Sequence, residues 1–339
     1  MTSLHEVALL RLVAQRIAGR AVATATEAVR ELTALQAQDL PGVLTSVALR
    51  TTSRSRQAVE DALDAGEVVR SWPMRGTLHL VVAEDLPWML QLAAPRVLAG
   101  AATRRAELGL DTATLERARD VAEVALAGGR RLTRDEMLET WTEGGVAATG
   151  PRGYHLLFHQ AQTGVLCFGP MRGCEQLVVL VDEWIPQPRR LERAEALGEW
   201  VERYFRSHGP ATVKDFTRWT NLVAADVRAG LALARPQLAS IDVEGVEHLM
   251  DPRIPDLFDA CRREARGTFP APRVRRVHPR LRRPAGDPAH RVRDSHRPRR
   301  QRRVPAHRRH RRPSRRHLEG RRPRGEAHAR SDAVHVVPG

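Results

Sequence analysis

The C-terminal fifth of the chain restricts where a folded core can lie. Residues 271–339 contain no Ile, Phe, Trp, Tyr or Met, but they contain nine prolines and 23 arginines. A segment of this composition cannot bury enough apolar surface to offset the entropy lost when its backbone is ordered. We therefore expect the folded body to end near residue 270, followed by an Arg/Pro-rich tail that is disordered or read out of frame.

The net charge of +15 would ordinarily favour a polyanionic partner such as nucleic acid. The tail alone carries +18, because five acidic residues oppose its 23 arginines. Residues 1–270 hold the other 32 basic and 35 acidic residues, which gives the body a net charge of −3. The total charge therefore provides no argument about what the body binds.

The tail is also unusual among basic segments because it has no lysine, and Lys214 is the single lysine of the whole chain. This scarcity indicates a GC-rich coding sequence. Permitted codons for RRVHPRLRRP (275–284) give DEFILGYADR when they are read one base later. The same shift turns residues 299–320 into a string with β-branched alternation and a D-G turn. We predict a frameshift in the gene or in its sequencing; the alternative is a real basic arm that binds phosphates by counterion release.

The cysteines and the N-terminus indicate an intracellular protein. Cys167, Cys174 and Cys261 contain no Cys-x-x-Cys pair, and an odd number argues against a disulfide framework. Charged residues interrupt the first 20 positions, so no signal core is formed. No apolar run approaches the ~20 residues that span a bilayer. We expect a soluble, cytoplasmic monomer with no membrane partner.

Helix and hairpin patterns follow each other three times along the body. Each round places helical patterns before a pair of strands, which is the order of a winged helix. The helical patterns cover 4–18, 28–35, 56–65, 112–127, 134–141, 151–163, 191–206, 213–220 and 223–235. The predicted strand pairs are 68–72 with 77–82, 165–169 with 177–181, and the two halves of IDVEGVEHLMD.

These patterns predict a mainly helical α+β protein with about three tandem winged-helix units. The first unit covers 1–108 and contains a glutamine motif, the second covers 109–188, and the third covers 189–270 and is incomplete. The tail, 271–339, follows them. The alternative is an α+β protein that has no nucleic-acid role.

The first candidate site is LQAQDLP (35–41), which contains Gln36 and Gln38. Glutamines two positions apart lie about 200° apart around a helix. Both can therefore face one site only where the helix ends, and Pro41 is expected to supply that end. Glutamine does not titrate, but it can orient a water or bind a sugar or base. The alternative is that the pair caps a helix end or binds a neighbouring loop.

The second candidate site is RSWPMRGTLHL (70–80). Alternate residues of a strand share a face, so Thr77 and His79 should lie opposite the two leucines. Gly76 permits close approach of the backbone to a partner, and Arg75 could hold a phosphate. The alternative is an ordinary polar strand face with Arg75 in a salt bridge.

The third candidate site is HGPAT (208–212) and the helix that follows it. The threonine of this segment is placed to cap the helix. Phe216 and Trp219 should face the core, whereas Lys214 and Arg218 lie one turn apart where a DNA-contacting helix would place them. The alternative is a solvated helix face.

We expect neither a metal nor a cofactor. His155 and His159 lie four residues apart on a predicted helix, but no third acidic or cysteine ligand accompanies them, so they are expected to be core or surface residues. The chain has no P-loop, GxGxxG or GxSxG motif.

Together these stretches resemble the winged-helix DNA-binding family that includes the AlkZ-type DNA glycosylases. The resemblance covers about residues 4–260. It is carried by RLVAQRIAGR near the N-terminus, LQAQDL, WPMRGTLHLV, CFGPMRG with DEWIP, and HGPATVKDF with the following RW. The out-of-frame strings of the tail also resemble the C-terminal section of that family.

The resemblance implies three tandem winged helices that form a concave surface for double-stranded DNA. It also implies a catalytic Gln–apolar–Gln triplet, which maps onto Gln36 and Gln38 with Ala37 between them. The implied reaction is hydrolysis of the N-glycosidic bond of an alkylated purine, in which Gln38 places a water and Gln36 holds that water or the sugar. The acidic body and the loss of the C-terminal section depart from the family. A non-catalytic DNA-binding or regulatory protein, and an inactive product of a frameshifted gene, remain as alternatives.

Overall fold

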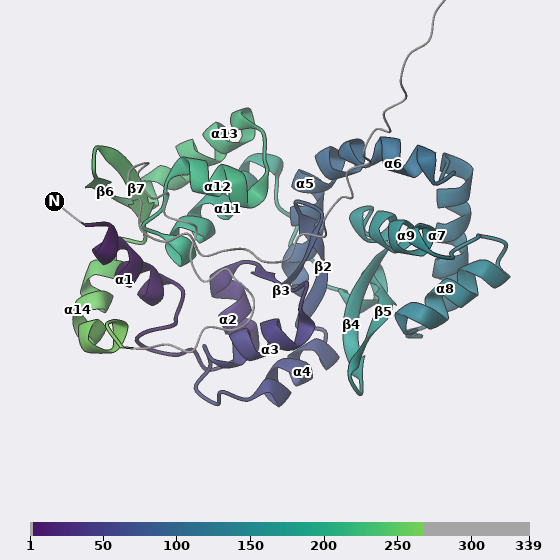
Figure 1. Cartoon of the computed structure of the whole chain (residues 1–339), viewed down its shortest axis with the longest axis horizontal. Coiled ribbons are helices and arrows are strands. Elements are labelled where there is room, and N and C mark those ends of the chain that lie inside the picture. The colour runs from purple at the N-terminus through teal and green to yellow at the C-terminus, as the bar shows by residue number, and fades with distance from the viewer. Residues whose placement is uncertain (1–2, 268–339) are drawn as a thin grey trace, which may run out of the picture. The chain divides into compact units, whose positions relative to one another are not determined.

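The structure is a computed structural model that describes residues 3–267 (Figure 1). The predicted tail, 271–339, lies outside the described residues. The described part is mainly helical with two small antiparallel sheets, so the predicted mainly helical α+β class is confirmed. None of the helices described is long and apolar enough to cross a membrane.

Four capped helices and one short strand make up the N-terminal part. The side chains of Ser3, Thr24, Asp39 and Ser55 each accept a hydrogen bond from a backbone N–H in the first turn of a helix. The last three of these helices enclose an aliphatic core with one face of the sheet. The elements are α1 (Leu4–Ala14), α2 (Ala25–Leu32), β1 (Leu35–Gln36), α3 (Leu40–Ala48) and α4 (Arg56–Asp64).

Two predicted hairpins join into one five-stranded antiparallel sheet in the order β1-β3-β2-β4-β5. They are joined where Arg70 pairs with Phe168. The sequence patterns predict each hairpin but not this pairing, because a contact between strands far apart in the chain leaves no local signal. The hairpins are β2 (Val68–Met74) with β3 (Thr77–Val82), and β4 (Leu166–Arg172) with β5 (Glu175–Leu180).

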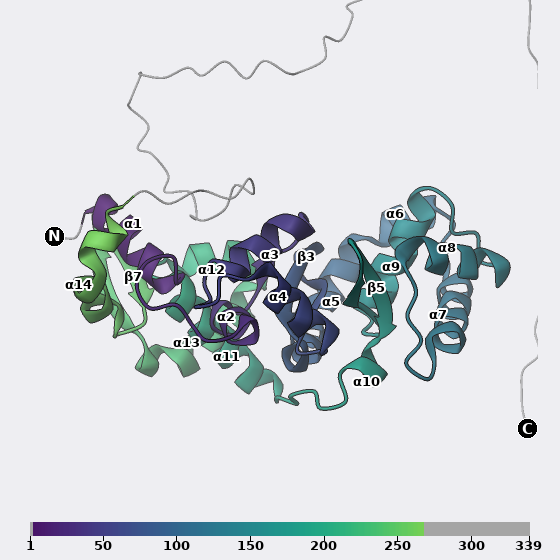
Figure 2. The same ribbon diagram turned by 90° about the horizontal axis from the view of Figure 1, so that it is seen from below.

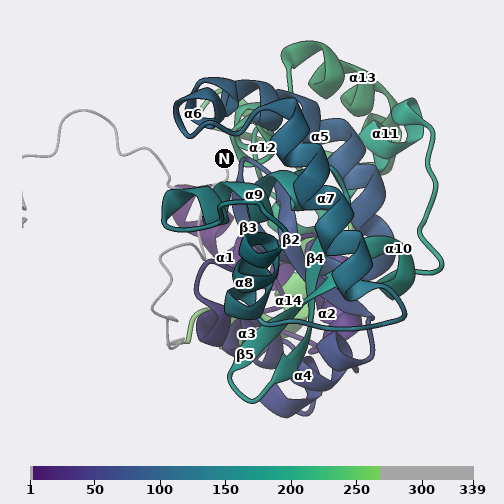
Figure 3. The ribbon, with the colours of Figure 1, turned by 90° about the vertical axis from the view of Figure 1, so that its right-hand side faces the viewer.

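Helices between the two hairpins cover the sheet. Thr133 and Glu136 form the predicted capping box at the start of α8. Trp72, Trp141 and Phe158 belong to the core that these helices share with the sheet, and Figure 3 shows α7, α8 and α9 in front of β4 and β5. The elements are η1 (Ala83–Asp85), α5 (Leu86–Gly100), α6 (Ala102–Glu107), α7 (Thr112–Leu126), α8 (Arg134–Glu143) and α9 (Pro151–Gln162).

The C-terminal part of the described chain returns to the N-terminus. α14 packs against α1, and Leu10 and Phe258 lie in their common core; Figure 2 shows the two helices side by side. The elements are α10 (Val181–Trp184), α11 (Arg193–His208), α12 (Val213–Thr220), α13 (Ala224–Ala234), η2 (Arg235–Gln237), β6 (Ala239–Val243), β7 (Val246–Met250) and α14 (Ile254–Ala265).

A buried carboxylate ties this part to the sheet region. Asp85 is 1 % exposed and accepts hydrogen bonds from Trp88 Nε1 (2.9 Å), Arg189 (2.9 Å) and Arg203 (2.6 Å). Glu199 of α11 pairs with both arginines. Because Asp85 is so completely buried, its removal would leave Arg189 and Arg203 with Glu199 alone as their common partner. The network holds α11 against the start of α5.

Candidate functional site

The glutamine motif begins on a short strand and continues into the bend before α3; it does not lie at the end of a helix. α2 ends at Leu32, where Thr33 takes a φ of 67°, and Leu35–Gln36 then pairs with β3. The prediction that Pro41 ends a helix is wrong: Asp39 caps α3 and Pro41 stands in its first turn. Proline fits there because its missing N–H would have no partner in a first turn anyway. The correction affects the chemistry, because Gln36 belongs to β1 and Gln38 to the bend that leads into α3.

Strand β3 holds the motif through hydrogen bonds. Ala37 N–H donates to Leu78 O (2.8 Å), and Leu78 N–H donates to Gln38 Oε1 (3.0 Å). Gln36 lies opposite His79 in the register, so these two side chains share a face. Gln38 is exposed and Gln36 is half-buried. The bond from Leu78 turns the Gln38 oxygen towards β3 and leaves its NH₂ group directed away from the strand.

Arg75 and Gly76 form the two-residue turn of the first hairpin. Their φ values are 55° and 66°, and two positive values suit the twist of the flanking strands. Arg75 Nη2 lies 3.3 Å from His79 Nε2, and His79 Nδ1 lies 2.8 Å from Thr77 O. A carbonyl only accepts, so His79 Nδ1 carries a proton, and Nε2 accepts from Arg75.

The polar face predicted for this hairpin is largely covered. His79 is 1 % exposed, and the Thr77 hydroxyl is buried without a hydrogen-bond partner among residues 3–267. A Cβ added to Gly76 would lie 3.6 Å from Phe158 and Val97, so the turn rests on α9 and α5. His79 is therefore placed to orient Arg75 and not to reach the surface itself.

The residues of α12 divide between surface and core as predicted. Lys214 and Arg218 are exposed one turn apart, whereas Phe216 is fully buried. The predicted cap is a capping box between Thr212 and Asp215. The helix therefore presents Lys214 from its capped first turn and Arg218 from its last turn.

Tyr204 of α11 packs against α12, with its ring centre 5.2 Å from that of Phe216 and 5.0 Å from that of Trp219. Burial raises the pKa of Tyr204 above its usual range; the charge of Asp215 adds to this, and those of Arg11 and Arg75 oppose it. Arg75 of the hairpin and Asp215 of α12 thus act on one hydroxyl. Arg11 is buried and its Nε donates to Pro210 O at 2.8 Å.

Sequence reasoning missed Tyr204, Arg11 and Arg70. Tyr204 is part of an amphipathic helix and is indistinguishable from an ordinary core aromatic residue. Arg11 is 2 % exposed, and its position inside an apolar run of α1 was the available signal. Arg70 stands between buried residues of a strand, which is an equally visible anomaly.

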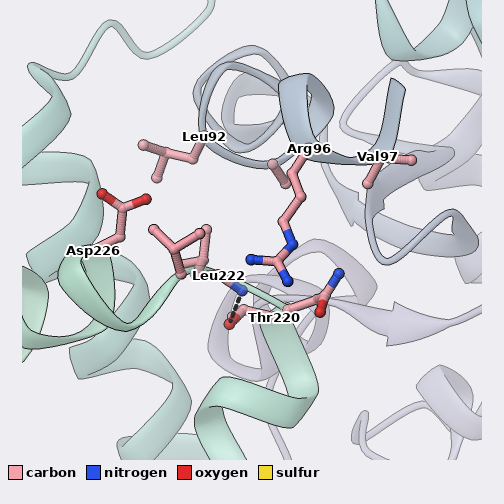
Figure 4. A pocket seen from close by; sticks show the side chains of 9 residues that line it. Leu92, Arg96, Val97, Thr220, Leu222 and Asp226 are labelled. Atoms are coloured by element: carbon pink, nitrogen blue, oxygen red, sulfur yellow. Dashed lines mark hydrogen bonds between the residues drawn. The ribbon is translucent and has the colours of Figure 1, made fainter. Parts of the chain in front are cut away.

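Two further features of residues 3–267 are a histidine pair on α9 and a small cavity. No group of three His, Cys, Asp or Glu side chains within 3–267 could hold a metal ion. His155 and His159 lie half-buried on α9. A cavity of about 30 Å³ between α5 and the turn after α12 has room for roughly one water. Figure 4 shows Arg96 reaching across it towards Thr220.

Comparison with known proteins gives consistent results. The family model described as "DNA glycosylase AlkZ-like" matches residues 29–281. The interstrand DNA cross-link repair glycosylase of Streptomyces sahachiroi is 27% identical over 265 residues, which are 72% of this chain and 68% of that protein. The solved structure of Streptomyces sahachiroi DNA glycosylase AlkZ superposes with a TM-score of 0.63 at 25% identity, covering 76% of this chain and 72% of that one. The glutamine motif, the first hairpin and α12 all lie in the matched range, and the chain belongs to the AlkZ-like DNA glycosylase family.

Proposed function

We propose that the chain hydrolyses the N-glycosidic bond of an alkylated purine in double-stranded DNA, with Gln36 and Gln38 as the catalytic pair. The observation that carries this proposal is that Gln36 at the end of β1 and Gln38 in the bend after it are both bound to β3, within the segment that matches the family. Similarity to a cross-link repair glycosylase adds cross-linked purines to the candidate substrates.

Two neutral amides suit such a substrate. A purine alkylated at N3 or N7 is already cationic, so it can leave without a strong general acid. A water placed by Gln38, together with stabilisation of the cation that develops on the sugar, is then sufficient. Gln36 holds that water or the sugar. The bond from Leu78 keeps the Gln38 amide in one orientation while this happens.

In this proposal the DNA lies on tandem winged-helix units, 1–108, 109–188 and 189–270. The helix–hairpin order of the three segments supports this division. A concave surface of this kind would accept bulky or cross-linked bases without full base flipping. We place the protein in the cytoplasm as a monomer.

Two groups of residues would contact the duplex. Arg75 would bind a phosphate beside the lesion, where Gly76 and Thr77 keep the backbone close. His79 orients Arg75 from below. Lys214 and Arg218 of α12 are exposed, and no ion pair holds either of them in the described part of the chain. They would bind the backbone at a second point.

The test is single-turnover release of base from a duplex that contains N7-methylguanine, repeated with a cross-linked duplex. We expect Gln38→Ala and Gln36→Ala to lower the rate by roughly 100-fold or more. Their affinity for the same duplex should be unchanged. Gln91→Ala, at an exposed glutamine of α5, is the matched control and should excise at the wild-type rate.

A non-catalytic DNA-binding or regulatory protein is the second candidate, which the exposed pair Lys214 and Arg218 favours. It predicts salt-dependent duplex binding without release of any base by the wild type. Gln38→Ala would then bind the duplex with the affinity of the wild type, and neither protein would release a base. Release of either lesion by the wild type would exclude this candidate.

We also propose that the codons for 271–339 are read out of frame, which leaves the third unit incomplete, so the protein with the restored frame is the wild type for every excision assay. The string DEFILGYADR, obtained from residues 275–284, supports this. Resequencing the codons for 265–290 and measuring the intact mass of the protein test it. A base missing or added relative to the genome is expected. If the gene has no missing or added base and the mass of the protein includes residues 271–339 as given, the frameshift is excluded. The alternative of a real basic arm would then apply.

A further inference from the structure

Arg70 reaches the glutamine motif from the far side of β3. Its Nε donates to the carbonyl of Ala37 at 2.8 Å. Arg70 pairs with Leu80 in the register, and Leu80 pairs with Leu35. These partners place the Arg70 side chain on the face of the sheet that packs on α2–α4, opposite the face that carries Gln36 and His79.

The second hairpin holds the other end of Arg70. Nη1 donates to Gln176 Oε1 at 3.3 Å, and the guanidinium carbon lies 5.6 Å from the centre of the Phe168 ring. Gln176 is itself buried, and its Nε2 donates to Gly169 O at 3.1 Å. Arg70 thus connects the β4–β5 hairpin to the peptide that joins Ala37 to Gln38.

Stability alone does not account for an arginine at this position. Burial lowers the pKa of Arg70 to about 10, because removing the cation from water costs free energy. No carboxylate pairs with it among the described residues. An apolar side chain of similar length would fill the same space without that desolvation cost. A role that needs the guanidinium explains the residue better.

The contact completes the restraint of the motif. Ala37 N–H is bonded to Leu78 O on one side of the residue, and its carbonyl is bonded to Arg70 on the other. Gln36 and Gln38 flank this doubly held residue. A rotation about the Ala37 Cα–C bond would turn Gln38 relative to Gln36, and a misplacement of about 1 Å can reduce a reaction rate roughly 100-fold.

We infer that Arg70 is a positioning residue, which fixes the peptide plane between Gln36 and Gln38 so that both amides point into the reaction site. The inference rests on the proposed function of the glutamines. It predicts that loss of the guanidinium affects the chemical step and leaves DNA binding intact. It also predicts that the segment around Ala37 becomes locally mobile when Arg70 is replaced.

The experiment compares Arg70→Met, Arg70→Lys and Arg172→Met in the full chain. Arg172 is an exposed arginine of β4 that pairs with Glu136 and serves as the control. We expect Arg70→Met to lower single-turnover excision roughly 10- to 100-fold while the Kd for the duplex changes less than about threefold. Arg70→Lys, which keeps a donor and the charge, should recover part of the rate. Arg172→Met should match the wild type.

Hydrogen exchange measured by mass spectrometry gives a readout that does not need activity. Residues 35–38 and Leu78 should exchange faster in Arg70→Met, with the core of α11 unchanged. Wild-type excision by Arg70→Met, or parallel losses of rate and affinity, would overturn the inference. If the wild type excises nothing, the proposed function fails, and exchange alone decides: unchanged protection at 35–38 then overturns the positioning role.

Discussion

The tetrapeptide Pro-Met-Arg-Gly occurs twice, at 73–76 in the first hairpin and at 170–173 in the second. Both copies follow a break in the strand register at the same place, between Ser71 and Met74 and between Phe168 and Met171. A proline has no N–H for the ladder, and such a break is where a strand tolerates it. The two hairpins therefore share the same break in strand register, which ends at Met74 in the first and at Met171 in the second.

They differ from the arginine onwards. In the first hairpin Met74 pairs with Thr77, so Arg75 lies in the turn with a positive φ and meets His79. In the second, Arg172 still pairs with Glu175, and the turn begins one residue later. Its guanidinium points to Glu136. Equal tetrapeptides thus give one arginine at the candidate site and one in a surface ion pair, because the residues after the glycine set the turn.

The residue before the tetrapeptide should give the largest difference between the hairpins. Trp72 is 3 % exposed and its ring centre lies 5.7–6.2 Å from those of Tyr154, Phe158 and Phe168. We expect Trp72→Ala to lower the free energy of unfolding by roughly 3–5 kcal/mol, measured by urea denaturation.

The equivalent position in the second hairpin is Gly169. An added Cβ would lie 2.9 Å from Trp184 Nε1, so Gly169→Ala should cost about 1–3 kcal/mol through overpacking. Equal losses of unfolding free energy in Trp72→Ala and Gly169→Ala would show that the two hairpins contribute equally to core packing. The hairpins would then not differ at this position.

The arginines should differ next, in DNA binding. Arg75→Ala should weaken duplex binding by roughly 1 kcal/mol, about fivefold, and reduce the slope of log K against log salt by about 1. Arg172→Ala should leave both quantities unchanged. Titrations at several salt concentrations measure them. Loss of affinity in both variants would mean that the turn geometry does not select the DNA-contacting arginine.

The smallest expected effect is a pH dependence confined to the first hairpin, whose turn rests on α9. Burial, helped by the charge of Arg105, lowers the pKa of His159 in that helix to about 4. The unfolded chain binds this proton near pH 6.5 and the folded chain does not, so stability falls as the pH drops from about 6.5 to 4. The protection factors of residues 75–78, which correct for the pH dependence of intrinsic exchange, should then be lower at pH 5 than at pH 7, and those of residues 172–175 should not.

His159→Gln should flatten that local dependence. Burial also lowers the pKa of His208, to about 3, so this histidine adds a similar slope elsewhere in the molecule. The decisive comparison is therefore hydrogen exchange at residues 75–78 in His159→Gln and in the wild type. The overall melting temperature of the wild type would combine the effects of both histidines. Unchanged low-pH exchange in His159→Gln would assign the effect to another group.

Local signals predicted most of the secondary structure. Caps at Thr133 and Thr212 and the turn at Glu244-Gly245 appear where the sequence patterns place them. The helix α5 was missed because Pro95 interrupts its pattern and because apolar residues surround it on most sides. The glutamine motif was assigned the wrong backbone, since Pro41 is compatible with the end of one helix and with the start of the next.

Tertiary relations were beyond local patterns. Nothing near Arg70 in the sequence indicates a bond to Ala37, and nothing near Tyr204 indicates that Arg75 and Asp215 act on it. Charge counting failed in another way. The residue count gives the correct net charge, but it does not show that Lys214 and Arg218 share one exposed helix face.

The brevity of β1 has an evolutionary consequence. Leu35 and Ala37 face the aliphatic core, whereas Gln36 and Gln38, at the alternate positions, are not part of it. Packing and the proposed chemistry therefore fall on alternate residues of β1 and the two positions after it. A lineage can exchange the reactive side chains for a new lesion while the scaffold stays intact, so that substrate range can diverge faster than architecture.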